Sequence, residues 1–61
     1  MRQQWAYRVT VTDRKGSITY TGKYISYQRA EAKAKAELAD TPNGMATIVS
    51  RWDGTCITLA A

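Results

Sequence analysis

The chain of 61 residues contains no histidine and no phenylalanine, and it has one cysteine and one proline. Without histidine, the common zinc sites and the Ser–His and Cys–His nucleophile pairs cannot be assembled. The single cysteine, Cys56, excludes an internal disulfide, and in so small a chain it predicts a reducing compartment, which we take to be the cytoplasm. Because no histidine is present to activate its thiol, we interpret Cys56 as a small apolar side chain.

Long hydrophobic runs are also absent, since the apolar stretches span only a few residues each. Together with the polar start of the chain, this pattern predicts neither a membrane-spanning helix nor a signal peptide. The four glycines stand singly, so they form no glycine-rich phosphate loop. The five acidic residues fall in expected turns or on an expected helix surface, where backbone and solvent account for them. We therefore expect no enzymatic activity, no metal and no cofactor.

The residues that are present are typical of a folded domain, with 44% hydrophobic residues, two Trp and four Tyr. A chain of this length is expected to form one domain, residues 1–61, with a thin margin of stability. Nine basic against five acidic residues give a net charge of +4, which favours acidic partners such as nucleic acid or an acidic protein surface. The alternative is that the charge serves solubility alone.

Alternation of large and polar residues predicts a first strand over residues 4–12 and a second over residues 17–25. Between them, Asp-Arg-Lys-Gly at residues 13–16 forms a loop in which Gly16 suits a positive φ. The two strands are therefore expected to form an antiparallel hairpin.

The hydrophobic pattern also predicts the register of this hairpin. A four-residue loop would pair Val11 with Ile18 and Val9 with Tyr20, and it would place all the large residues on one face. A three-residue loop ending in a bulged Gly16 would shift the pairing by one residue and split the apolar set between the two faces. The pattern therefore favours the longer loop.

A strong helix signal covers residues 27–40, which are rich in Ala, Glu, Lys, Gln and Arg. Ser26 supplies an N-cap, and Glu31 and Lys35 have the favourable spacing of four. A narrow stripe of mostly Ala side chains is expected to pack on the sheet, namely Tyr27, Ala30, Ala34 and Leu38. Thr-Pro-Asn-Gly at residues 41–44 ends the helix and reverses the chain.

The last part of the chain predicts a second hairpin, with strands over residues 45–52 and 55–59. The Asp-Gly pair between them is a strong signal for a two-residue type I′ turn, which would pair Trp52 with Thr55. This register gathers the apolar side chains on one face, namely Ala46, Ile48, Trp52, Ile57 and Leu59.

Together these elements predict an α+β fold of order ββαββ, in which two hairpins form a four-stranded antiparallel sheet with one helix packed on one face. The residues expected to be buried together are Val9, Val11, Ile18, Tyr20, Leu38, Ile48, Ile57 and Leu59. Trp5 and Trp52 are expected to be at least partly covered. A core this small also allows a homodimer through an edge strand or through exposed aromatic residues.

The side of the sheet away from the helix is the first candidate site. It is expected to carry Arg8, Lys23 and Arg51 among threonines, without an acidic strand residue. Arg14 and Lys15 are expected to extend this basic surface at the first loop. We interpret it as a partner-binding surface. The alternative is a solvated sheet face, where Thr and Lys are common and deter edge pairing.

The aromatic residues form a second candidate site. Base stacking is disfavoured, because the strand aromatics are expected to point mostly to the core. Trp5 and Trp52, together with Tyr24, are expected to lie near the ends of the hairpins, where a partly exposed Trp is a good anchor for a protein partner. The alternative is that these large rings fill a small core that lacks Phe.

The layout as a whole carries a resemblance over about residues 5–59. The predicted order of elements resembles that of small ββαββ proteins of phages and mobile elements. The features that carry this resemblance are a first hairpin, an Ala-rich helix with Glu-Ala-Lys-Ala-Lys-Ala-Glu at residues 31–37, Gly44, and a second hairpin around Asp53 and Gly54. Some anti-CRISPR inhibitors share this build. The resemblance implies a stoichiometric inhibitor that blocks a nucleic-acid-handling protein complex, and it carries over no functional residue. A bacterial domain of the same layout, or an accessory protein that binds nucleic acid directly, is the alternative.

Overall fold

The protein forms a four-stranded antiparallel sheet with one helix on one face. The computed structural model describes residues 5–60. The elements are β1 (Tyr7–Thr12), β2 (Ile18–Tyr24), α1 (Tyr27–Ala39), β3 (Met45–Ser50) and β4 (Cys56–Ala60). The strand order is β2-β1-β3-β4. The predicted fold class is therefore confirmed. The predicted first strand began at residue 4, which lies outside the described part of the chain.

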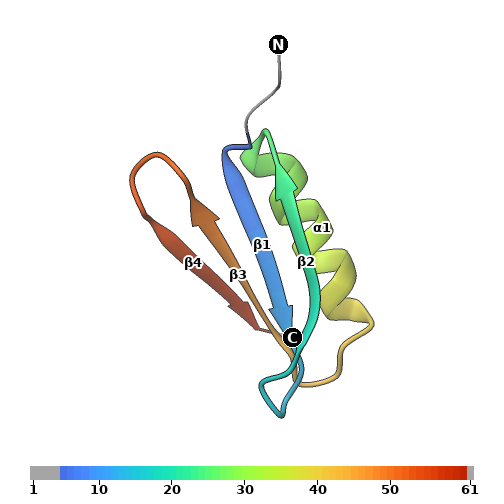
Figure 1. Ribbon diagram of the computed structural model, residues 1–61. Coiled ribbons are helices and arrows are strands. Elements are labelled where there is room, and N and C mark those ends of the chain that lie inside the picture. Colours follow the sequence, from blue (N-terminus) through green and yellow to red (C-terminus); the bar gives the residue numbers. More distant parts are fainter. Residues whose placement is uncertain (1–4, 61) are drawn as a thin grey trace.

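The two hairpins join through β1 and β3 at the centre of the sheet. Val9 lies opposite Ile48, and Val11 lies opposite Ala46. All four side chains are buried, with exposed fractions of 1% or less. Because β2 and β3 both run antiparallel to β1, they are parallel to each other, and α1 is the crossover between them. Figure 1 shows α1 behind β1 and β2, while β4 forms the edge of the sheet farthest from the helix.

The helix forms much as its sequence predicts. It ends at Ala39, with Asp40 as its C-cap, one residue before the predicted end. The Ser26 Oγ accepts a hydrogen bond of 3.2 Å from the backbone N–H of Arg29, which is the expected N-cap contact. Ala30, Ala34 and Leu38 are buried against the sheet. Small side chains at this stripe let the helix approach the sheet closely, as predicted.

The first hairpin uses the three-residue loop that the hydrophobic pattern had disfavoured. The backbone N–H of Asp13 donates to the carbonyl of Ser17 at 2.9 Å, which leaves residues 14–16 as the loop. Gly16 has a φ of 88°, the left-handed geometry of a bulged glycine at the end of such a loop. The predicted four-residue loop is therefore wrong.

A bulge in β2 then returns the following large side chains to the face of the sheet that the helix covers. Thr12 pairs with Ile18, but the next pair along is Val11 with Tyr20, so Thr19 is the extra residue. The loop shifts the register by one residue, and the bulge shifts it by one more. Because the total shift is even, Tyr20 and the alternate residues after it still face the core side.

Ile18 lies before the bulge, so its side chain does not lie on the face of the sheet that the sequence predicted. Its side chain falls out of phase with the core and is 66% exposed. Tyr20 and Tyr24 instead close over Gly22, where an added Cβ would lie 2.9 Å from the Tyr24 Oη. The expectation that Ile18 is buried is therefore wrong.

The second hairpin also has a longer connection than predicted. The backbone N–H of Ser50 donates to the carbonyl of Thr55 at 2.9 Å, so the loop spans residues 51–54 in place of a two-residue turn. Gly54 closes this loop with a φ of 73°. The register again shifts by two, so the faces are kept, but Trp52 lies in the loop and is 69% exposed. The expected cover of Trp52 is therefore wrong.

The core is smaller than the predicted set. Val9, Val11, Leu38 and Ile48 are buried, while Tyr20 and Leu59 are partly buried against them. Ile57 is 37% exposed because α1 packs chiefly over the other three strands. Within residues 5–60, no helix is long and apolar enough to cross a membrane.

The turn from α1 into β3 depends on Gly44. Asn43 has a φ of 57°, and the Gly44 N–H donates to the carbonyl of Thr41 at 3.0 Å. A Cβ at Gly44 would lie 2.6 Å from the Thr41 Cγ2 and 2.7 Å from the carbonyl oxygen of Thr12. Since a carbonyl of β1 cannot swing away as a side chain can, no side chain fits at this position.

We predict that Gly44→Ala lowers the free energy of unfolding by about 2 kcal/mol, the usual cost of overpacking a rigid site. Gly22→Ala is the matched control, since its added Cβ would meet the outer ends of the Tyr20 and Tyr24 rings, which can rotate. Urea denaturation compares the two variants. An equal loss for both would contradict the account of the turn.

Candidate functional site

The open face of the sheet, on the side opposite α1, places two cations side by side. Arg8 on β1 lies directly opposite Lys23 on β2 and opposite Val49 on β3. Because Val9 is buried on the helix side, strand alternation puts Arg8 and Lys23 on the open face, where both are exposed. Like charges directly opposite each other in a sheet cost stability. The fold therefore maintains an unfavourable pair at this place.

Two tryptophans and a third cation adjoin this pair. The Lys23 Nζ lies 5.5 Å from the centre of the Trp5 ring, and the Arg51 Cζ lies 5.3 Å from the same ring. The Arg51 Cζ also lies 5.6 Å from the Trp52 ring. Lys23, Trp5, Arg51 and Trp52 thus follow one another in alternation. We call these four residues, together with Arg8, the basic cluster.

Backbone hydrogen bonds hold the basic cluster in place. The Arg51 N–H donates to the carbonyl of Ala6 at 2.8 Å, which ties the loop after β3 to the segment before β1. The Arg51 Nη1 also donates to the Trp5 carbonyl at 3.4 Å, a long contact. Exposed cation–π contacts contribute about 0.5–1 kcal/mol each, about as much as two like charges cost when they lie opposite in a sheet. The Trp rings therefore offset the repulsion without neutralising the charge.

Carboxylates do not neutralise the basic cluster within residues 5–60. The two salt bridges of this part of the chain are both on α1, Lys33 with Glu37 at 3.1 Å and Lys35 with Glu31 at 3.9 Å. Asp53 is close in sequence, but its Oδ1 accepts from the backbone N–H of Thr55 at 3.0 Å. Hydrogen bonds from Thr55 hold the pKa of Asp53 below its ordinary value, so this carboxylate serves its own loop.

Arg14 and Lys15 lie apart from the basic cluster. Both belong to the loop after β1, whereas Arg8 is at the start of that strand, so they are at the opposite end of the sheet. They line a shallow hollow that also contains acidic residues, among them Glu37 and Asp40. The structure therefore does not bring together all the basic residues that the sequence suggested for one surface.

The predicted aromatic site merges in part with the basic one. Trp5 and Trp52 belong to the basic cluster, but Tyr24 points to the helix side and shares a hydrogen bond with the hydroxyl of Tyr20. Sequence reasoning missed the contact between Trp5 and Arg51. These residues are 46 positions apart, and only the pairing of β1 with β3 brings them together. No local signal contains that pairing.

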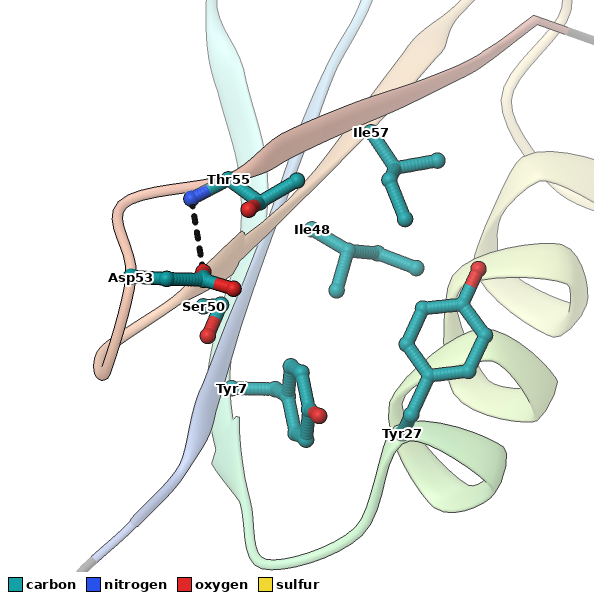
Figure 2. A pocket seen from close by; sticks show the side chains of 7 residues that line it. All are labelled: Tyr7, Tyr27, Ile48, Ser50, Asp53, Thr55 and Ile57. Carbon is teal, nitrogen blue, oxygen red and sulfur yellow. Dashed lines mark hydrogen bonds between the residues drawn. The ribbon is translucent and has the colours of Figure 1, made fainter.

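A groove on the helix side is the other notable hollow, with a volume of about 420 Å³. Figure 2 shows Ile48 and Ile57 between the two tyrosine rings on one side and the Asp53 loop on the other. Tyr7 and Tyr27 pack edge to face with their ring centres 5.6 Å apart. The groove offers apolar area, and Asp53 is the single carboxylate among its lining residues.

The side-chain types that commonly bind metal ions are scattered over the part of the chain that the structure describes. Across residues 5–60, no three His, Cys, Asp or Glu side chains gather closely enough to hold a metal ion. Cys56 is exposed, and its Sγ lies 3.8 Å from the carbonyl oxygen of Gly54.

None of the protein-family models, curated proteins or solved structures compared with this chain matches it.

The Tyr20–Tyr24 pair makes a prediction for alkaline pH. Burial first, and then the hydrogen bond and charge of Tyr20, raise the pKa of Tyr24 to about 12. Since an unfolded tyrosine titrates near pH 10, the stability that neutral Tyr24 contributes is complete below pH 10 and is lost as the pH rises through 12. Tyr24→Phe should reduce the loss of stability between pH 9 and pH 12, measured by urea denaturation. An unchanged pH dependence in Tyr24→Phe would contradict this assignment.

Proposed function

We propose that the protein is a non-enzymatic cytoplasmic module that binds an anionic macromolecule through the basic cluster. The observation that supports this most directly is the pair of Arg8 and Lys23, which lie opposite each other without a carboxylate partner among residues 5–60. An anionic partner would convert their repulsion into attraction. Arg51 adds a third positive charge, and its guanidinium geometry suits carboxylates and phosphates equally.

The first partner class is the acidic surface of a nucleic-acid-handling protein complex, which the module would occupy and block. The resemblance to small ββαββ inhibitors of phages implies this role. Trp52 supports a protein partner, because it is exposed beside Arg51, and Trp and Arg are among the residue types enriched at the energetic centres of protein interfaces. A row of paired threonines crosses the open face beside the cluster, namely Thr21, Thr10, Thr47 and Thr58. Such a row suits a polar rim.

A second candidate is direct binding of single-stranded nucleic acid. Trp52 favours it, since this ring is 69% exposed and carries a guanidinium on one side. Base stacking on aromatic rings beside a basic track is the usual way in which single strands are held. The sequence had disfavoured stacking because the strand aromatics were expected in the core, and Trp52 lies outside that set.

A matched pair of double variants tests the proposal. Arg8→Thr with Lys23→Thr removes two charges from the basic cluster, and Arg14→Thr with Lys15→Thr removes two charges from the opposite end of the sheet. Both variants have the same net charge. We expect the first to lose at least tenfold in affinity for the partner and the second to lose little. The measurements are titration with a single-stranded oligonucleotide and quantitative capture of partner proteins on each immobilised variant. Equal losses in the two variants would sink the proposal.

Salt dependence separates the two partner classes. If a single strand binds directly, the slope of log affinity against log salt should fall by about 1.4 in the Arg8 and Lys23 double variant, because each removed phosphate contact contributes about 0.7. If the partner is a protein, the oligonucleotide should bind weakly and alike to parent and variants. Capture of the protein partner should then depend on the basic cluster.

A further inference from the structure

Strand β4 is the last strand of the sheet, and no strand among residues 5–60 pairs with its outer edge. Ser50 and Thr55 form a hydrogen-bonded pair, and such pairs recur at every second residue of an antiparallel ladder. Residues 57 and 59 therefore bond to β3, and Cys56, Thr58 and Ala60 direct their N–H and C=O groups outward. No charged residue occurs in β4, whose sequence is Cys-Ile-Thr-Leu-Ala.

The two edges of the sheet differ in their protection. On β2, the other edge, the bulge at Thr19 interrupts the strand and Lys23 places a charge on it. Bulges and lysines are common devices that stop an edge strand from pairing with another chain. Strand β4 has neither. An isologous dimer through β4 would therefore close on itself, since the two edges that it leaves are the protected copies of β2.

We propose that β4 pairs antiparallel with β4 of a second copy of this chain, with Thr58 opposite Thr58 of that copy at the two-fold axis. In this register all three outward residues find partners, because Cys56 then lies opposite Ala60 of the second copy. Ile57 lies opposite Leu59 of the second copy, on the helix side. The neutral sequence of β4 introduces no repulsion between the copies, whereas β2 carries Lys23.

The incomplete cover of the helix side supports this register. Ile57 is 37% exposed, and Leu59 is only partly buried, because α1 packs mainly over β1, β2 and β3. The dimer would place two copies of Ile57 and Leu59 in one continuous apolar row at the centre of an eight-stranded sheet. Each Leu59 would then cover the Ile57 of the other copy, beside the groove of Figure 2.

The dimer would also present two basic clusters on one open face. Five strand spacings of about 4.8 Å separate the two copies of β1, so the clusters would lie at least about 24 Å apart. Binding of one long partner to both would increase affinity without any new contact. This consequence rests on the proposed function, whereas the dimer itself does not.

Sedimentation velocity of the full chain tests the dimer directly. We expect a shift from monomer to dimer as the concentration rises through the micromolar range. Thr58→Pro removes an outward N–H that β3 does not use, and proline is tolerated on a free strand edge. This variant should remain folded by circular dichroism and require at least tenfold more protein to dimerise. Thr21→Pro is the matched control, because Thr21 has the same place on the free edge of β2, and it should dimerise as the parent does.

Charged variants at the two-fold axis test the register. Thr58→Lys and Thr58→Glu should each be monomeric, since like charges would meet at the axis, and an equal mixture of the two should recover the dimer. A parent chain that stays monomeric up to millimolar concentration would overturn the proposal. So would a dimer that Thr58→Pro leaves unchanged, or a mixture of the charged variants that does not associate. None of these results depends on the anionic partner, so the proposed function is judged separately.

Discussion

The structure depends on one geometric constraint, which is that the apolar strand residues must share the one sheet face that a single helix can cover. The helix has 13 residues, and it seals that face with only three buried side chains, Ala30, Ala34 and Leu38. The opposite face is consequently left mostly to polar residues. Both hairpins satisfy the constraint through irregular features, a bulge at Thr19 in one and a four-residue loop in the other. An even shift of register leaves one or two apolar side chains exposed. An odd shift would turn every apolar side chain of a strand to the opposite face of the sheet.

Local physical chemistry accounts for what the sequence predicts correctly. Helix propensity, the cap at Ser26 and the turn at Gly44 act over a few residues, so the elements and the fold class follow from the sequence. Register is harder, because periodicity fixes only the parity of a shift. That is why Ile18, expected inside, and Trp52, expected to be at least partly covered, are both exposed, while Val9 and Ile48 are buried as expected. The order β2-β1-β3-β4 needs pairing between distant strands, which no local pattern contains.

The same long-range pairing determines what could be predicted of the candidate site. Strand alternation alone places Arg8 and Lys23 on one face, but the contact of Arg51 with Trp5 exists only because β3 lies beside β1. Arg14 seemed continuous with them in sequence and is remote in the fold. The basic cluster thus arises from the central strand pair, which also carries the largest buried side chains. We infer that the fold gives up some stability for binding at the pair of Arg8 and Lys23.

The central claim is that the pairing of Arg8 with Lys23 is unfavourable in the free protein and is kept for an anionic partner. The most direct test is the thermal midpoint of Arg8→Thr, measured without any partner at 20 mM and at 1 M sodium chloride. At low salt the midpoint should rise by about 2 °C, because the repulsion with Lys23 is removed. At 1 M salt most of this gain should vanish, since charges are then screened within about 3 Å. A midpoint that falls at low salt and does not respond to salt would contradict the claim, because Arg8 would then stabilise the fold.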